Sequence, residues 1–354
     1  MSIIERARPA IRALSAYSSA HMEAGAEGLR FNANELPFTP RAGCGRQLNR
    51  YPVPQPPELL QRMAGIIGCE PERLLLTRGS DEAIDLLVRA FCDTGRDAIA
   101  ITPPVFGMYQ VAADIQGVAV QRFPLQEQHG FLPDLDAMAE ALAPECKLVF
   151  LCSPHNPVGT AIEPERILAF CRRVADRCLV VVDEAYVEFS PQGSLAPVLD
   201  QQDNLAILRT LSKAWGLAGA RLGVLAGSPE LIQLLRKVLP PYPIPEPVRA
   251  VVMEVTDPVR RSDFHHHLQT VLDEKRKLGD FLQRSPLVET VFPSAANFFL
   301  VRFHDSQAVF QACRRQNLHL RDQSRQPGLE RCLRITVGSP EENQRLMHVL
   351  EQMA

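Results

Sequence analysis

The sequence predicts an α/β protein with a large domain on a mostly parallel, doubly covered sheet, followed by a smaller α+β C-terminal domain. Short apolar runs alternate with amphipathic segments through the first two thirds of the chain, as is typical of strand–helix units around a buried parallel sheet. After a proline-rich stretch at 239–248 the pattern changes to one long charged helix and a few further elements. A chain of 354 residues is long enough for two domains. We place an N-terminal arm at 1–50, the large domain at 51–245 and the small domain at 246–354.

The individual elements follow from hydrophobic periodicity. In the large domain, Ser80-Asp81-Glu82 supplies a good N-cap for an amphipathic helix, with Ile84, Leu87, Val88 and Phe91 at helical spacing. Buried strands are expected at 98–102, 148–152, 179–183, 205–210 and 222–226, with helices at 109–116 and 164–176. In the small domain we expect a helix at 258–284, a strand at 297–303, a helix at 306–317, a strand at 332–338 and a last helix from Pro340.

Composition excludes several classes of protein. A net charge of −3 leaves no basic surface for nucleic acid, and no run of about 18 apolar residues offers a membrane span. The N-terminus is charged and does not resemble a signal peptide, so we expect a cytoplasmic protein. Nine cysteines without a C-x-x-C pair indicate free thiols. The run His265–His267 lies in a helical stretch, where neighbouring side chains diverge, so we assign no metal.

Polar side chains follow three of the predicted strands at the point where each strand ends. Asn156 comes just after the strand at 148–152, Asp183 ends the next strand with Tyr186 three residues on, and Lys213 follows the strand at 205–210. An Asn-Pro pair by itself is typical of an ordinary turn. A carboxylate at the end of an apolar strand, however, is costly to bury without a cationic partner. Because ligands of such sheets bind at the carboxyl ends of the strands, we expect these side chains to share one site.

One cofactor chemistry requires this combination. Only five of the 38 basic residues are lysines, and lysine, unlike arginine, can lose its proton and form an imine with an aldehyde. A carboxylate keeps a pyridine nitrogen protonated, and Asn and Tyr can bond the ring's phenolic oxygen, so the site suits pyridoxal 5′-phosphate. The cofactor phosphate would lie at a glycine turn and helix N-terminus, beside two hydroxyls and an arginine. The residues of this expected phosphate site are Gly79, Ser80, Asp81, Thr210, Ser212 and Arg221.

Several stretches also resemble a known family. SPHNPVG, VVDEAYVEF and TLSKAWGLAGARLG are similar to motifs of the fold-type I, class II pyridoxal-phosphate aminotransferases. FNANELP, NRYP, TRGSDEAIDLLVRAFC, PPVFGMY, LRDQ and CLRITVGSPEENQ resemble the histidinol-phosphate aminotransferases within that group. The resemblance runs over nearly the whole chain. It departs from the usual SPNNPTG at His155 and Val158, while the cofactor-binding Asn156 is retained.

The resemblance implies further roles. Tyr109 would stack on the cofactor ring, and Tyr51 would reach the cofactor phosphate of a partner subunit, since these enzymes are homodimers. Tyr17 and Asn34 would border the substrate. Arg334, helped by Arg321, would bind the phosphate of histidinol phosphate and, in the second half-reaction, the carboxylate of glutamate or 2-oxoglutarate. The implied reaction is a ping-pong transamination that yields imidazole-acetol phosphate and glutamate, with Lys213, Asp183 and Tyr186 as catalytic residues.

Other functions share part of this pattern. An aromatic aminotransferase or a threonine-phosphate decarboxylase of the same fold would carry every cofactor motif, and only the substrate distinguishes them. A nicotinamide-dependent dehydrogenase also has a doubly covered sheet, but the G-x-G at 43–45 lacks a third glycine and a preceding strand. A cofactor-binding sensor without activity would not need the intact lysine, aspartate and arginines.

Overall fold

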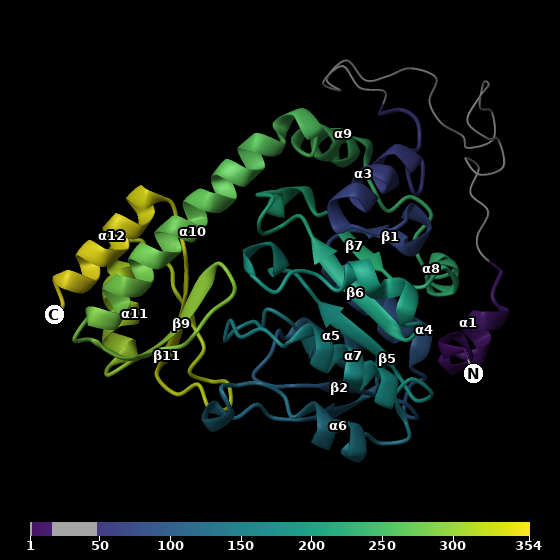
Figure 1. Cartoon of the computed structure of the whole chain (residues 1–354), viewed down its shortest axis with the longest axis horizontal. Coiled ribbons are helices and arrows are strands. Elements are labelled where there is room, and N and C mark those ends of the chain that lie inside the picture. Colours follow the sequence, from purple (N-terminus) through teal and green to yellow (C-terminus); the bar gives the residue numbers. More distant parts are fainter. Residues whose placement is uncertain (1, 16–47) are drawn as a thin grey trace.

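The computed structural model describes residues 2–15 and 48–354, and it has the predicted architecture of a large α/β domain beside a smaller domain (Figure 1). The large sheet has the strand order β1-β7-β6-β5-β4-β2-β3, in which β7 is antiparallel to both neighbours and the other pairs are parallel. Its strands are β1 (Leu74–Thr77), β2 (Ala98–Ile101), β3 (Ala119–Arg122), β4 (Cys146–Cys152), β5 (Leu179–Asp183), β6 (Leu205–Thr210) and β7 (Gly223–Ala226).

All five strands predicted in this domain are confirmed, and two more are present. The sequence analysis missed β1 and β3, which have only four residues each. β3 forms one edge of the sheet and is partly exposed, so it lacks the continuous apolar run by which the inner strands are recognised.

Helices cover both faces of the large sheet. They are α1 (Pro9–Ala13), α3 (Pro57–Ile67), α4 (Ser80–Phe91), α5 (Met108–Gln116), α6 (Leu135–Ala141), α7 (Pro164–Arg173), α8 (Pro229–Arg236) and α9 (Glu246–Val255). Apolar side chains of α3, α6 and α7 share one core with the sheet, and those of α4, α5 and α8 share the core on the other face. Both sets are the amphipathic segments expected of a doubly covered sheet.

The start of α4 differs from the predicted capped helix. Its N-cap residue is Gly79, at φ 77° and ψ 169°, and no side chain in the described part of the chain caps the helix end. The Glu82 carboxylate instead accepts a hydrogen bond from the Arg78 backbone N–H at 2.7 Å. Within the described residues, the first N–H groups of α4 therefore have no side-chain acceptor, which is the arrangement that suits an anion.

The small domain is built on a four-stranded antiparallel sheet in the order β10-β11-β9-β8. Its elements are α10 (Arg261–Arg284), β8 (Val288–Val291), β9 (Phe298–Phe303), α11 (Ser306–Arg315), β10 (Arg321–Asp322), β11 (Cys332–Thr336) and α12 (Pro340–Glu351). The long helix begins three residues later than predicted, because Pro258–Arg260 forms a 3₁₀ turn capped by Asp257. The other elements predicted for this domain are present with ends shifted by a few residues.

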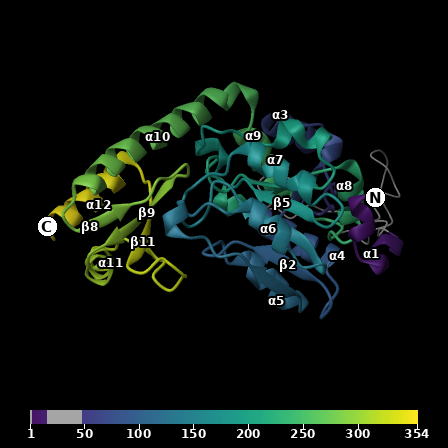
Figure 2. The same cartoon turned by 60° about the horizontal axis from the view of Figure 1, so that its bottom comes forward.

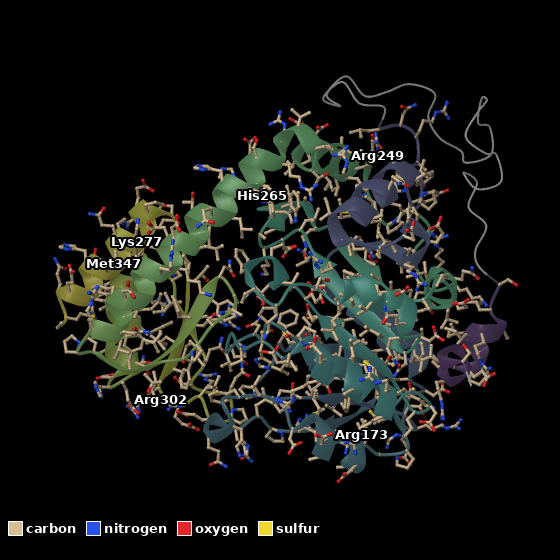
Figure 3. All side chains as sticks on the ribbon, viewed as in Figure 1. Arg173, Arg249, His265, Lys277, Arg302 and Met347 are labelled. Carbon is tan, nitrogen blue, oxygen red and sulfur yellow. The ribbon has the colours of Figure 1, made fainter. Side chains whose placement is uncertain are left out.

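Several contacts join the domains. Figure 2 shows α10 running from α9, beside the large domain, to the small sheet. Arg302 of β9, labelled at the lower edge of the small domain in Figure 3, donates hydrogen bonds from Nη1 and Nη2 to the Glu127 carboxylate of the large domain, at 2.8 and 2.7 Å. Val252 of α9 belongs to the large-domain core. The boundary between the domains that we placed at residue 245 stays a prediction. Among the described residues, we find no helix that could span a lipid bilayer.

Candidate active site

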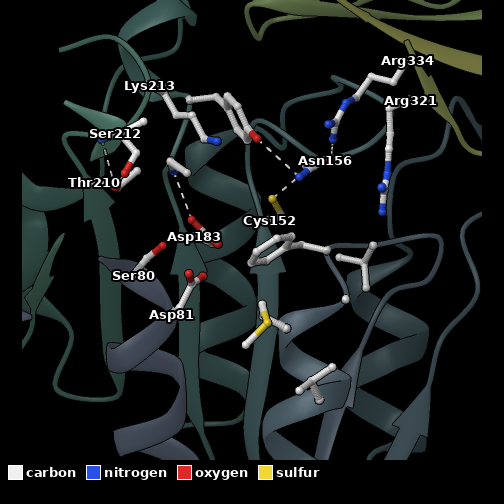
Figure 4. A pocket seen from close by; sticks show the side chains of 18 of the residues that line it. Ser80, Asp81, Cys152, Asn156, Asp183, Thr210, Ser212, Lys213, Arg321 and Arg334 are labelled. Carbon is white, nitrogen blue, oxygen red and sulfur yellow. Dashed lines mark hydrogen bonds between the residues drawn. The ribbon is translucent and has the colours of Figure 1, made fainter. Parts of the chain in front are cut away.

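A cavity of about 570 Å³ lies where the carboxyl ends of β4, β5 and β6 face the small-domain sheet (Figure 4). Eleven of the residues singled out from the sequence line it: Ser80, Asp81, Asn156, Asp183, Tyr186, Thr210, Ser212, Lys213, Arg221, Arg321 and Arg334. The predicted meeting of the three strand ends is thus present. Its physical basis is that parallel neighbouring strands end at the same edge of a sheet.

Asp183 lies at the bottom of the cavity, at the end of β5. It is paired with Cys152 of β4 and Leu208 of β6, so its position is set by the central register of the sheet. Tyr109 Oη donates a hydrogen bond to its Oδ2 at 2.7 Å, and the Ala185 backbone N–H donates to its Oδ1 at 3.1 Å. Burial raises the pKa of Asp183 to about 6, against the lowering effect of these two hydrogen bonds. The carboxyl group is therefore ionised at neutral pH, although it is 3% exposed.

The structure places Tyr109 behind the cavity wall, and the stacking role that the resemblance implied for it stays a prediction. Tyr109 lies inside α5, is fully buried and stacks on Phe150 of β4 with ring centroids 4.8 Å apart, so it offers no ring face to the cavity. Its hydroxyl group contacts Asp183 from the side that lies away from the cavity. Phe106, three residues earlier in the loop after β2, lines the cavity instead. The signal that could have identified Phe106 is its place at the carboxyl end of a strand, the same signal that identified Asn156.

Asn156 and Tyr186 meet above Asp183. Asn156 Nδ2 donates to Tyr186 Oη at 3.3 Å, and Asn156 Oδ1 accepts a hydrogen bond from Arg334. The Tyr186 ring packs edge-on against Phe298 of β9, with centroids 5.2 Å apart. Burial raises the pKa of Tyr186, so its hydroxyl stays protonated and can donate a hydrogen bond to an oxygen of a bound ring.

Lys213 extends into the cavity from the loop after β6. Its Nζ lies 5.6 Å from the centre of the Tyr186 ring. Burial lowers the pKa of Lys213, the nearby Arg334 lowers it further, and Asp183 and Asp81 act in the opposite direction. A lowered pKa increases the fraction of neutral amine, the form that attacks an aldehyde.

A cradle for an anion lies on the large-domain side of the lysine. Arg221 Nη2 bonds Asp81 Oδ2 at 3.2 Å and Nη1 bonds Ser212 Oγ at 3.2 Å, while Thr210 Oγ1 donates to Ser212 Oγ at 2.9 Å. Gly79 has φ 77°, a conformation that side chains rarely adopt, and a Cβ there would also lie 2.5 Å from Arg221 Nη2 and displace the end of that side chain, so glycine suits this turn.

The opposite wall carries two arginines of the small domain. Arg321 of β10 is paired in register with Arg334 of β11, and both line the cavity. Arg334 also lies over the Phe298 ring, with Cζ 5.2 Å from its centre. Gln323 and Gln326, which the sequence analysis did not single out, line the same wall. The only sequence signal for Gln323 was its place in the LRDQ stretch.

The remaining predicted residues lie elsewhere. Tyr51 is outside the cavity, 49% exposed, with its ring stacked on Tyr242 at a centroid distance of 4.3 Å. Tyr17 and Asn34 lie outside the described residues. His155, next to Asn156, is buried, and burial lowers its pKa to about 4, so its imidazole is neutral at physiological pH.

The cavity fits pyridoxal phosphate on structural grounds. It combines an uncapped helix end beside Arg221, a buried carboxylate at its base, two neutral hydrogen-bonding groups and an amine of lowered pKa. These groups match the phosphate, the ring nitrogen, the phenolic oxygen and the aldehyde of that cofactor.

The chain matches known proteins over nearly its whole length. The model of the aminotransferase class I and II family matches residues 23–350. The histidinol-phosphate aminotransferase of Xanthomonas euvesicatoria pv. vesicatoria is 44% identical over 353 residues, which are 99% of this chain and 97% of that protein. That of Aeromonas hydrophila subsp. hydrophila is 41% identical over 354 residues, 100% of this chain and 99% of the relative.

Solved structures share the fold. The histidinol-phosphate aminotransferase from Clostridium acetobutylicum superposes with a TM-score of 0.78 at 19% identity, covering 86% of this chain and 91% of that one. The L-threonine-O-3-phosphate decarboxylase from Porphyromonas gingivalis superposes with a TM-score of 0.71 at 23% identity, covering 86% and 91%. The fold is thus shared by enzymes of different reaction types, and it does not select the substrate.

Proposed function

Because the chain belongs to the aminotransferase class I and II family, we propose that it transfers the amino group of L-histidinol phosphate to 2-oxoglutarate, forming imidazole-acetol phosphate and glutamate. This is a pyridoxal-phosphate-dependent reaction of histidine biosynthesis. Relatives more than 40% identical over nearly the whole chain are named for this activity. The observation that carries the proposal is the register pair Arg321–Arg334, which faces Lys213 across the cavity and suits a phosphate-bearing substrate.

Each catalytic group has a task that follows from its surroundings. The cofactor, when bound, supplies an aldehyde that combines with amines and a ring that accepts electrons. The ionised Asp183 would hold a proton at the ring nitrogen. Asn156 and Tyr186 would orient the ring through its phenolic oxygen, and Phe106 would cover one ring face. Lys213 Nζ would move the proton between the substrate carbon and the cofactor carbon that bears the aldehyde.

We also propose that the enzyme works as a cytoplasmic homodimer. Tyr51 supports the dimer, because it is an exposed aromatic residue outside the cavity of its own chain. In a dimer it would reach the cofactor phosphate of the partner subunit. Sedimentation at micromolar concentration tests the dimer, and a monomer of about 39.4 kDa that is fully active would refute it.

A spectrum of the purified enzyme tests the cofactor and the substrate together. Histidinol phosphate, added without an acceptor, should remove the long-wavelength absorption of the bound cofactor, and 2-oxoglutarate should restore it. A band that responds to phenylalanine or threonine phosphate but not to histidinol phosphate would refute the substrate and favour the alternatives of the same fold.

Substitution of the lysine tests the mechanism. Lys213→Ala should abolish multiple turnovers, and Lys213→Arg should do the same although it keeps the positive charge, because guanidinium cannot serve as a neutral amine. Near-normal turnover by either variant would refute the assignment.

A further inference from the structure

We propose that Gln323 is a substrate-binding residue that donates its side-chain amide to the phosphate of the substrate. This inference rests on the proposed function and deepens it, because it names a third group, besides the two arginines, that distinguishes a phosphate from a carboxylate.

Strand register places Gln323 on the same face as both arginines. Arg321 is paired with Arg334, and the Gln323 backbone N–H donates to the Cys332 carbonyl at 3.0 Å, which continues the same antiparallel ladder. Side chains two residues apart on a strand point to the same face. Gln323 therefore lies on the face that presents the two guanidinium groups, and it lines the cavity with them.

A neighbouring side chain sets the orientation of the amide. Gln326 Nε2 donates to Gln323 Oε1 at 2.7 Å, and the Gln326 backbone N–H donates to the Gln323 carbonyl at 2.9 Å. The acceptor atom of Gln323 is thus used. Its Nε2 makes no hydrogen bond within residues 2–15 and 48–354. Because Gln323 is only 5% exposed, this amide nitrogen is a donor held in place beside the cavity.

The chemistry of the two substrates explains why a third donor is useful. A carboxylate has two oxygens, which one guanidinium fork can bind. A phosphate ester has three terminal oxygens and more negative charge, so it can use a further donor. A neutral amide adds that donor without strengthening the attraction for every anion. We expect Gln323 to contribute to the binding of histidinol phosphate much more than to the binding of glutamate.

The experiment measures each half-reaction of the holoenzyme separately. The absorbance change of the bound cofactor, followed at increasing histidinol phosphate or glutamate, yields an apparent Kd and a limiting rate for each substrate. Gln323→Glu keeps the shape and the acceptor for Gln326 but replaces the donor by a second acceptor. Gln323→Met removes the donor without adding charge. Gln316→Met, at an exposed position after α11, is the matched control.

For Gln323→Met we expect the Kd for histidinol phosphate to rise about 10- to 100-fold, as for a lost hydrogen bond to a charged group, while the Kd for glutamate changes less than about 3-fold. Gln323→Glu should raise the Kd for histidinol phosphate further. The limiting rates should stay near those of the wild type. Equal effects on both substrates, or none, would overturn the inference alone. A wild-type enzyme that responds to glutamate but not to histidinol phosphate would overturn the proposed function, and the inference with it.

Discussion

Replacing Asp183 by asparagine should make the cofactor-free enzyme more stable at neutral pH while it removes nearly all activity. The carboxylate is 3% exposed at the end of β5, where its two hydrogen bonds only partly offset the loss of water. Asparagine has nearly the same shape and no charge. The Tyr109 hydroxyl can turn to accept from the new amide, as it would from a protonated carboxyl group, although its own hydrogen then loses the Asp183 acceptor.

The magnitude follows from the raised pKa. Burial moves the pKa of Asp183 from 3.8 to about 6. The folded protein therefore binds more protons than the unfolded chain between these values, so stability falls as the pH rises through this window. Above pH 6 the ionised carboxylate lowers the free energy of unfolding by about 3 kcal/mol, because each pKa unit corresponds to about 1.4 kcal/mol. For a chain of this length, that corresponds to a rise in Tm of about 4 °C on substitution.

Thermal or denaturant unfolding of the cofactor-free proteins, measured from pH 4 to 8, tests this expectation. The Asp183→Asn variant should match the wild type near pH 4 and exceed it increasingly up to about pH 6. Asp203→Asn, at an exposed position, is the matched control and should show no such trend. Added pyridoxal phosphate should reverse the order, because only the carboxylate can pair with the protonated ring nitrogen.

The reasoning would be refuted by a variant that is less stable than the wild type at pH 8, or by a stability difference independent of pH. Either result would mean that the carboxylate is already well solvated or paired in the cofactor-free protein. A retained transamination rate in Asp183→Asn would separately refute the task assigned to this carboxylate.

Two further substitutions test the surroundings of the site. Gly79→Ala would place a methyl group 2.5 Å from Arg221 Nη2 at a φ of 77°, and we expect at least about 10-fold weaker cofactor binding, followed by the fluorescence of the single tryptophan. Gly95→Ala, at φ 68° with nothing within 4 Å, should lower stability but leave cofactor binding unchanged. Arg209→Met would leave two carboxylates without their cation, the partly buried Glu188 at 2.6 Å and the buried Glu184 at 3.7 Å, and should lower the free energy of unfolding by about 3–5 kcal/mol. A wild-type Tm for this variant would contradict that estimate.

Much of the fold follows from local sequence alone. A strand buried on both faces of a parallel sheet needs a continuous apolar run, so β4, β5 and β6 were visible without any knowledge of their neighbours. Their polar ends then had to meet, because parallel neighbours end at one edge. The arginines of β10 and β11 were predicted only from the family resemblance. They lie in a different domain, and the positions of the strand ends in the large domain do not indicate that they share a site with the lysine.

The sequence by itself determined which functional side chains follow the strands. Asn156, Asp183 and Lys213 lie at three successive strand ends, because each position depends only on where an apolar run stops. Tertiary structure decided which side chains face the cavity. Tyr109 and Phe106 lie three residues apart, and the packing of α5 on the sheet buries the first and leaves the second, half-buried, at the cavity wall. The position of Gln323 on the same face as the two arginines likewise became visible only through the pairing of β10 with β11. The rotation of a helix and the register of a short strand are set by contacts with distant segments, which local sequence does not contain.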